Sequence, residues 1–217
     1  MRCFVRSIII AASALVAITS VSALAGGALD PCRWSLDGSF TSTLFLRLYT
    51  RPNPLAGESY LQSSKFVLNE TSPESAMLAI MDPGGKNIGY IHVHRETFLM
   101  DAQGKGDLPG FSFDIYIKPE HESSGFGSLL MLYMANHLEQ RSSKLRPPVE
   151  FSEKAAKSFE RLEAARLVKR ITARKKNGEN VQVWEFDLSG ISDADRADLG
   201  SLPVPGIAAW PGTLSGL

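Results

Sequence analysis

Apolar and polar residues alternate most regularly between residues 76 and 117, and this alternation predicts β-strands. The segments "AMLAIMD" and "NIGYIHVHRE" flank the turn Pro83–Gly85, a combination typical of a β-hairpin. After a glycine-rich loop at 104–110, the segment "FSFDIYI" alternates again, and Pro119 ends the pattern because proline cannot donate to a sheet ladder. The middle of the chain is therefore predicted to form a β-sheet.

Beyond Pro119 the apolar residues recur every three or four positions, which predicts helices. One helix follows the glycines near residue 126 and carries apolar side chains from Leu130 to Leu138 on one side. A second begins at the N-cap residue Ser152 and continues past Phe159. The segment "PPVEF" between them predicts a short strand, and residues 167–188 predict a hairpin that turns at "NG".

The two flanks of this core have weaker patterns. "TSTLFLRLYT" predicts a strand, and "SYLQSSKFVL" predicts a strand or a short helix. Residues 189–217 contain three prolines and five glycines, and only "DADRADL" has helical character. We interpret this segment as a flexible, poorly packed tail, with partner binding as the alternative role.

The order strand, strand, strand, helix, strand, helix, strand, strand predicts an α/β domain of the α+β type, with a mixed central sheet and crossover helices. A chain of 217 residues has room for one good-sized domain. The predicted organisation is a targeting segment at 1–25, a segment of uncertain structure at 26–75, a core at 76–188 and the tail at 189–217.

The first 25 residues have the pattern of a secretory signal peptide. Arg2 and Arg6 precede an apolar run from Ile8 to about Val21, and the small residues of "SALA" precede Gly26. We expect cleavage after Ala25 and a secreted or periplasmic protein. The alternative is an uncleaved membrane anchor, because the run approaches the roughly 20 apolar residues that span a bilayer.

Charge and cysteine content exclude two further classes. The full chain has a formal net charge of 0, and removal of Arg2 and Arg6 with no acidic residue would leave a charge of about −2. Such a balance offers no general attraction for nucleic acid, so we expect no nucleic-acid partner. Cleavage would also leave Cys32 as the only thiol, which excludes an internal disulfide.

The junction "HESSGFGSLL" is the strongest candidate binding motif. A Gly-x-Gly turn that leads into a helix exposes backbone N–H groups, and the helix dipole adds partial positive charge, so a phosphate is the natural ligand. A dinucleotide-binding fingerprint would need a third glycine where Leu130 stands, and a P-loop would need Gly-Lys-Ser/Thr. Neither motif is present.

The stretch "IKPEHESSGFGSLL" resembles the core motif of the GNAT family of N-acetyltransferases: a strand, a proline, polar residues, Gly-x-Gly and a helix with small and leucine residues. Downstream, "VEFSEKAAKSFERLEAARLVKRI" is similar to the fifth strand and fourth helix of that family. The resemblance covers about residues 77–188 and implies an N-acetyltransferase-like fold.

The resemblance also implies a cofactor and a reaction. Acetyl-CoA, or another acyl-CoA, would be the cosubstrate, and an unidentified amine would attack its thioester. The pyrophosphate would rest on the loop formed by Glu122, Ser123, Ser124, Gly125, Phe126, Gly127 and Ser128. The pantetheine arm would lie where the strand of residues 111–117 separates from that of residues 149–151.

Three positions depart from the family pattern and support an alternative function. Glu122 stands where Gln or Arg is usual, Phe159 where a tyrosine acid is common, and "AAR" where a glycine usually precedes the last Phe. The alternative is an exported, non-catalytic acyl-CoA-binding or protein-interaction module that keeps the fold.

Other ionisable residues supply candidate catalytic groups. His92 is a candidate general base, and Tyr116 is a candidate acid or substrate contact, with packing as the alternative role of Tyr116. His92 and His94 have a spacing that could hold a metal, but no third ligand is evident in their hairpin, so no metal site is predicted. Lys118, Arg146 and residues 174–176 are candidates for the outer phosphate of CoA, and the alternative for residues 174–176 is a solvated hairpin tip.

Overall fold

The computed structural model describes residues 40–202 of the chain, so the predicted signal peptide and the end of the predicted tail lie outside the described residues. The helices in this part are α2 (Phe40–Thr50), α3 (Tyr60–Ser63), η2 (Pro119–His121), α4 (Phe126–Glu139), α5 (Glu153–Ala164) and α6 (Asp193–Ser201). The strands are β1 (Lys65–Ser72), β2 (Ser75–Met81), β3 (Asn87–Arg95), β4 (Leu99–Met100), β5 (Phe111–Ile117), β6 (Val168–Lys175) and β7 (Asn180–Phe186).

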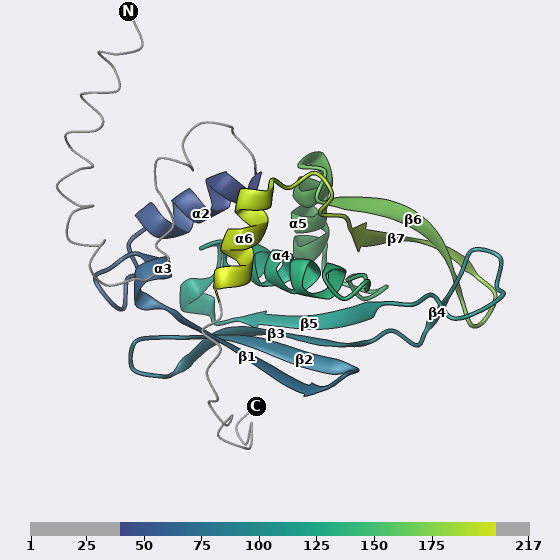
Figure 1. Cartoon of the computed structure of the whole chain (residues 1–217), viewed down its shortest axis with the longest axis horizontal. Helices are drawn as coiled ribbons and strands as arrows, with labels where there is room; N and C mark the ends of the chain where they lie inside the picture. Colours follow the sequence, from purple (N-terminus) through teal and green to yellow (C-terminus); the bar gives the residue numbers. More distant parts are fainter. Residues whose placement is uncertain (1–39, 203–217) are drawn as a thin grey trace, which may run out of the picture. The chain divides into compact units, whose positions relative to one another are not determined.

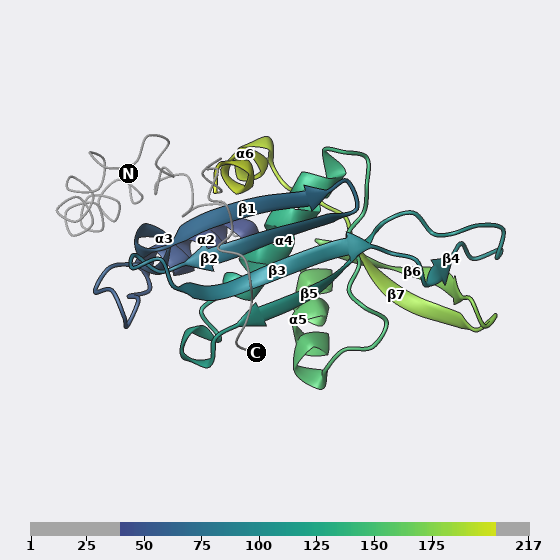
Figure 2. The ribbon, with the colours of Figure 1, turned by 90° about the horizontal axis from the view of Figure 1, so that it is seen from below.

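The strands form two antiparallel sheets, and this confirms the α+β class. The prediction of one mixed central sheet is wrong, because every ladder between named strands is antiparallel and β4, β6 and β7 form a sheet of their own. The larger sheet has the order β1-β2-β3-β5, and the smaller one has the order β4-β6-β7. Figure 1 shows the helices gathered on one side of the larger sheet, with α4 closest to it. In Figure 2, which is seen from below, no helix of the described residues covers the opposite face, and we call this the open face of the sheet.

Helix α4 forms the centre of the core. Its residues from Leu129 to Ala135 are all buried, as are Leu78, Ile91 and Val93 on the covered face of the sheet. A helix buried on nearly every side packs against more than one layer. The second layer includes α6, where Arg196 Nη1 donates to Asn136 Oδ1 at 3.1 Å.

Two sequence predictions of strands are wrong. Residues 41–50 form helix α2, because Leu44, Phe45 and Leu48 are buried at helical spacing and this burial outweighs the strand propensity of the threonines. Residues 147–151 form no strand, because Pro147 and Pro148 have no N–H to donate.

The predicted tail is packed over part of its length. Ser192 caps α6 through its Oγ, which accepts from Asp195 N at 3.1 Å, and Leu199 is fully buried. Ser42 Oγ donates to Asp195 Oδ1 at 3.3 Å, so α6 is tied to α2 as well as to α4. The part of the tail beyond residue 202 lies outside the described residues.

The two sheets are joined at residues 144–146. Phe111 N donates to Lys144 O at 2.8 Å, Arg146 N donates to Phe111 O at 2.9 Å, and Phe186 N donates to Leu145 O at 3.0 Å. The side chain of Arg146 reinforces this joint, since its Nη2 lies 2.6 Å from Glu185 Oε2 and its Nη1 donates to Pro109 O at 3.1 Å. Arg146 is only 2% exposed, so it forms a structural ion pair and is not available to a CoA phosphate.

We predict that Arg146→Met strongly destabilises the protein. The substitution leaves the buried carboxylate of Glu185 without its main partner, which costs about 3–5 kcal/mol of unfolding free energy in comparable sites. Urea unfolding followed by circular dichroism measures the effect. The control is Arg95→Met, which breaks the exposed pair with Glu74 and should cost less than about 1 kcal/mol. Equal unfolding midpoints for the two variants would contradict the prediction.

Candidate functional site

The loop between β5 and α4 has a backbone shape that depends on glycine. Gly125 is the N-cap of α4 with φ of 113°, in the left-handed region where side chains are strained. A Cβ at Gly125 would also lie 2.7 Å from Leu44 Cδ1 of helix α2. The glycine predicted as part of a phosphate cradle is thus also required by the close approach of α2.

Two arginines of the α2 region hold this loop from behind. Arg47 Nε donates to Ser124 O and Arg47 Nη2 to Ser123 O, both at 3.0 Å, and Arg51 Nη1 donates to Ser123 O at 2.6 Å. Burial and the neighbouring cations Arg51 and Arg161 lower the pKa of Arg47 from its ordinary value, yet an arginine stays charged in proteins. The loop carbonyls are therefore occupied by cations.

A cavity of about 710 Å³ opens between this loop, β5 and α5. We call it the loop cavity. The predicted cradle residues Glu122, Ser123, Ser124, Gly125, Gly127 and Ser128 all line it. The amides of Gly127 and Ser128 lie in the first turn of α4, where no carbonyl of the same helix can accept from them, and the helix dipole is positive there.

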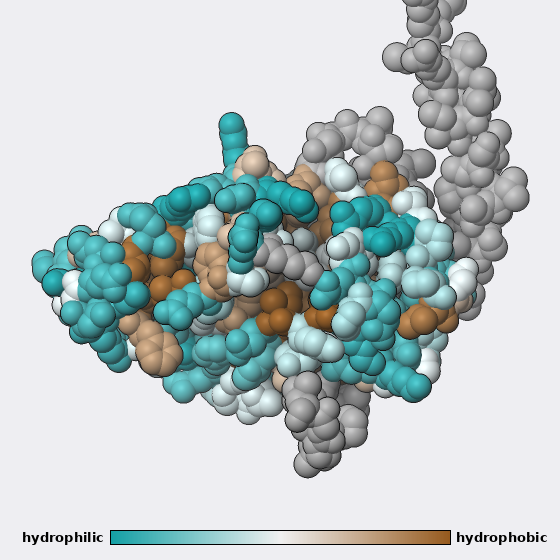
Figure 3. Space-filling view, turned by 180° about the vertical axis from the view of Figure 1, so that it is seen from behind, coloured by the Kyte–Doolittle hydropathy of each residue, from teal (hydrophilic) through white to brown (hydrophobic). Residues whose placement is uncertain are grey.

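Side chains of the loop cavity supply both charge and apolar surface. The cations are Arg47, Lys157 and Arg161, and the carboxylates are Asp114, Glu122 and Glu150. The apolar residues include Ile115, Ile117, Met131, Phe151 and Phe159. Figure 3, the view from behind, shows a mainly hydrophilic surface on which apolar atoms gather in a few places, one of them near the middle of the face.

The cavity exists because two chain segments separate. An isolated parallel bridge joins Phe111 to Leu145, and beyond it Pro147 and Pro148 lead the chain away from β5. Apart from this bridge, β5 pairs only with β3 among the described residues. The edge of β5 that faces α5 therefore has backbone groups outside any ladder.

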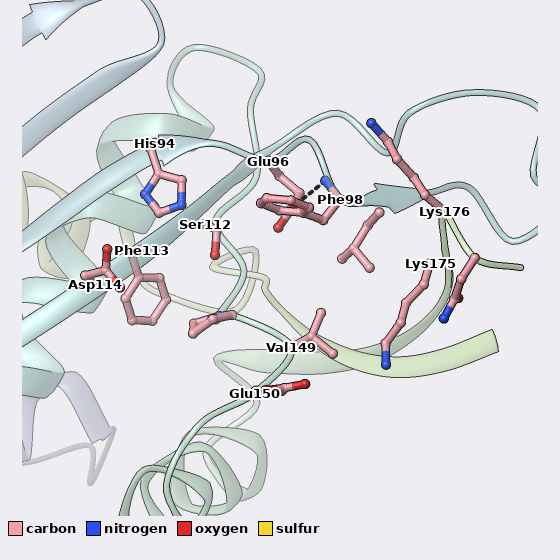
Figure 4. A pocket seen from close by; sticks show the side chains of 13 residues that line it. His94, Glu96, Phe98, Ser112, Phe113, Asp114, Val149, Glu150, Lys175 and Lys176 are labelled. Carbon is pink, nitrogen blue, oxygen red and sulfur yellow. Dashed lines mark hydrogen bonds between the residues drawn. The ribbon is translucent and has the colours of Figure 1, made fainter. Parts of the chain in front are cut away.

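A second cavity of about 700 Å³ adjoins the loop cavity and shares part of its wall. Figure 4 shows His94 and Asp114 at one end of this cavity and Lys175 and Lys176 at the other. Phe113, Asp114, Pro148 and Glu150 line both cavities. The two cavities thus share part of their wall, and this shared part includes the acidic residues Asp114 and Glu150.

Three predicted site residues lie elsewhere. Phe126 is fully buried and packs edge-on against Tyr60, at 5.1 Å between ring centroids, because the apolar ring fills the core below the loop. Tyr116 and His92 are on the open face of the sheet and line neither cavity. Side chains alternate along a strand, so these two lie on the other face of the sheet from Ile115 and Ile117. Tyr116 is 41% exposed and packs on Tyr90.

Phe159 has a packing role. It stacks on Trp184 with 5.3 Å between ring centroids and contacts Phe113, Phe151 and Phe186. An aromatic ring in such a cluster contributes buried apolar area and edge contacts, and a phenyl ring has no proton to donate. This arrangement explains why phenylalanine stands at the position.

His121 also belongs to the loop cavity, and sequence reasoning missed it. It is completely buried and lines the cavity, and neither ring nitrogen has a hydrogen-bond partner within the described part of the chain. Its ring packs edge-on against Tyr60 at 5.8 Å. Burial, and to a lesser degree Lys118, lower the pKa of His121 against the opposing effect of Glu120 and Asp82, so the neutral imidazole is favoured.

The open face carries one further cluster. His92, His94 and Asp114 each place a metal-ligating atom within 4.8 Å of the others. Asp114 is the third ligand that the hairpin alone did not provide, since it comes from β5, where it pairs directly with His92 of β3. The prediction of no metal site did not take this third residue into account, and it stays a prediction.

Comparison with known proteins does not assign the chain to a family. No protein-family model matches the chain, and no curated protein matches it significantly. No helix among residues 40–202 is long and apolar enough to span a membrane.

We predict that His121 makes the protein less stable in mild acid. Because the folded-state pKa is lowered, the unfolded state binds a proton first, and the free energy of unfolding falls as the pH drops below about 6.5, by at most about 1.4 kcal/mol per pH unit. His121→Leu should reduce this slope, measured by urea unfolding between pH 7.5 and 5.5. His137→Leu, which changes a histidine paired with Glu70, should retain the contribution of His121. An unchanged slope in His121→Leu would refute the assignment.

Proposed function

We propose that the loop cavity binds an acyl-CoA and that the protein transfers its acyl group to an amine. The observation that carries this proposal is the cavity of about 710 Å³ whose wall is the glycine loop at the N-terminus of α4. Its volume lies within the range of small-molecule and cofactor sites. An N-acetyltransferase-like arrangement of β5, the loop, α4 and α5 is part of the same proposal.

The phosphate end of the ligand fits the loop. Backbone amides at a helix N-terminus favour anions, and Arg47 and Arg161 add full positive charges to the same cavity. Residues 174–176, the sequence candidates for the outer phosphate, are at the hairpin tip; Lys175 and Lys176 line the second cavity, and Arg174 Nε donates to Gly178 O. The cations of α2 and α5 are therefore better placed for a pyrophosphate.

The extended middle of the ligand fits the free edge of β5. An amide-containing arm such as pantetheine can hydrogen-bond to an unpaired strand edge in the way that a peptide adds to a sheet. Ile115, Ile117 and Met131 line this part of the cavity and supply apolar contacts. The divergence after Leu145 leaves this edge open to the cavity.

In this proposal the reaction takes place where the two cavities share a wall. The amine nitrogen attacks the thioester carbonyl carbon, the C–S bond breaks, and the thiolate of CoA takes up a proton while the amine loses one. Glu150 is our candidate general base, because this acidic residue lines both cavities and an amine could enter from the second one. Tyr116 and His92 line neither cavity, so the roles first considered for them have no support from geometry.

The second candidate function is binding without catalysis. It is favoured by Phe159, which packs in an aromatic cluster where a proton donor would serve the leaving sulfur. Binding of acyl-CoA without transfer to any amine would support this alternative.

We predict micromolar binding of acetyl-CoA, abolished by Gly127→Trp. Gly127 lines the loop cavity, and a Cβ there has only an ordinary contact with Ile115 Cδ1 at 3.7 Å, so the indole fills the cavity without disturbing the core. Isothermal titration calorimetry of the purified protein measures the affinity. Gly125 is unsuitable for this purpose because any side chain there would strain the loop.

The matched control is Gly106→Trp. A Cβ at Gly106 meets no atom within 4 Å, and Gly106 lines neither cavity, so this variant should bind like the unmodified protein. Equal affinity of the Gly127→Trp and Gly106→Trp proteins, or no binding by the unmodified protein, would count against the loop cavity as the cofactor site.

We predict that Glu150→Gln lowers the rate of acyl transfer by about 100-fold or more while acetyl-CoA binding stays unchanged. The amide keeps the size of the side chain but cannot accept the proton of the ammonium, and general bases contribute about 10²–10⁴-fold. Release of free CoA thiol in the presence of a panel of amines measures the rate. Glu153→Gln is the control, because Glu153 is exposed in the first turn of α5 and lines neither cavity.

A further inference from the structure

We propose that His92, His94 and Asp114 form a binding site for a divalent transition-metal ion such as Zn²⁺ on the open face of the sheet. The three side chains supply two imidazole nitrogens and one carboxylate, and their ligating atoms lie within 4.8 Å of one another. This inference is independent of acyl-CoA binding, because it concerns different atoms and a different ligand.

The strand geometry brings the three residues together. His92 and His94 are two residues apart on β3, so both point to the same face, with 5.9 Å between ring centroids. Asp114 of β5 pairs with His92 across the antiparallel ladder, and directly paired side chains on one face lie next to each other. The site is therefore built from one face of two neighbouring strands.

The positions of the three backbones are fixed, while the side chains can adjust. Strand β3 is hydrogen-bonded to β2 on one side and to β5 on the other, which holds the Cα atoms in register. Tetrahedral Zn²⁺ with bonds of about 2.1 Å needs ligand atoms roughly 3.4 Å apart. The imidazoles are half-buried and Asp114 is exposed, so small rotations of these side chains can close the remaining gap.

Ser75 prepares His92 for metal binding. Its Oγ lies 2.9 Å from His92 Nε2, which leaves Nδ1 as the nitrogen available to an ion. With a metal on Nδ1, the proton of the neutral ring is on Nε2 and is donated to Ser75 Oγ. Such a hydrogen bond from the far side of a metal-binding histidine fixes the ring orientation, and its loss costs about 10–100-fold in metal affinity.

The ligand types select the class of metal. Imidazole nitrogen suits Zn²⁺, Co²⁺ and related ions, whereas Mg²⁺ and Ca²⁺ prefer oxygen ligands throughout. Three protein ligands leave a fourth position for water, as in catalytic zinc sites. Asp114 also lines both cavities, so the open position would lie beside the end of the second cavity shown in Figure 4.

Titration with Co²⁺ or Zn²⁺ alone tests the proposal. The protein is prepared without a histidine tag, stripped with a chelator and carried in a Cys3→Ser, Cys32→Ser background, because both cysteines lie outside the described residues and a thiol is itself a metal ligand type. We expect one ion per chain by calorimetry and visible absorption bands from four-coordinate Co²⁺. His94→Ala and Asp114→Asn should each weaken binding by about 100-fold or more, and Ser75→Ala by about 10–100-fold.

His137→Ala is the matched control, since His137 belongs to α4 and is hydrogen-bonded to Glu70 away from the cluster. It should bind the ion like the unmodified protein. A second measurement needs no variant: Co²⁺ should selectively broaden the imidazole NMR signals of His92 and His94 at substoichiometric concentration. Binding no tighter than millimolar, equal losses in His94→Ala and His137→Ala, or broadening of His137 instead would overturn the proposal.

Discussion

The structure depends on the point where residues 145–148 diverge from β5. A single parallel bridge, between Phe111 and Leu145, precedes this divergence. Leu145 joins the larger and the smaller sheet through its backbone, and the two prolines that follow cannot extend the ladder. The buried pair of Arg146 and Glu185 fixes the joint immediately before the divergence. Because the separation begins directly after this hydrogen-bonded joint, the cavity between β5 and α5 follows from the path of the chain.

A second constraint acts on the opposite wall of this cavity. The glycine loop has no regular secondary structure between η2 and α4, and its carbonyls accept from Arg47 and Arg51. These donors come from a region some 70 residues earlier in the chain, so the loop is shaped by tertiary contact as well as by its glycines. The arginines occupy carbonyl groups of the loop, whereas the first-turn amides of α4 have no acceptor within their own helix.

Local signals explain why much of this fold could be predicted. The hairpin of β2 and β3, strand β5, helices α4 and α5 and the hairpin of β6 and β7 each have clear periodicity and turn residues. Helix α2 was missed because its β-branched and aromatic residues favour a strand locally, whereas the buried stripe of Leu44 and Leu48 acts only in the folded protein. The strand predicted at 147–151 failed because its two prolines outweigh the apolar pattern.

Some residues of the candidate site could also be predicted from the sequence, and others could not. Glycines 125 and 127 could be predicted because a turn into a helix leaves a sequence signature. Arg47 and His121 could not, since nothing in their neighbourhoods indicates that one contacts the loop and the other is buried without a partner. Asp114 was recognised only as a strand residue, because the register that pairs it with His92 spans the long connection between β3 and β5.

The open edge of β5 gives a physical reason to expect a ligand. Unpaired strand edges invite association with other chains, and proteins usually cover or charge them. Here the proline-directed divergence keeps residues 147–151 from pairing with the edge, while the acidic residues Asp114 and Glu150 line the cavity beside it. An edge that is kept unpaired but screened by charge is suited to a small ligand with its own amide groups, because such a ligand can complete the hydrogen bonds that a second strand would otherwise make.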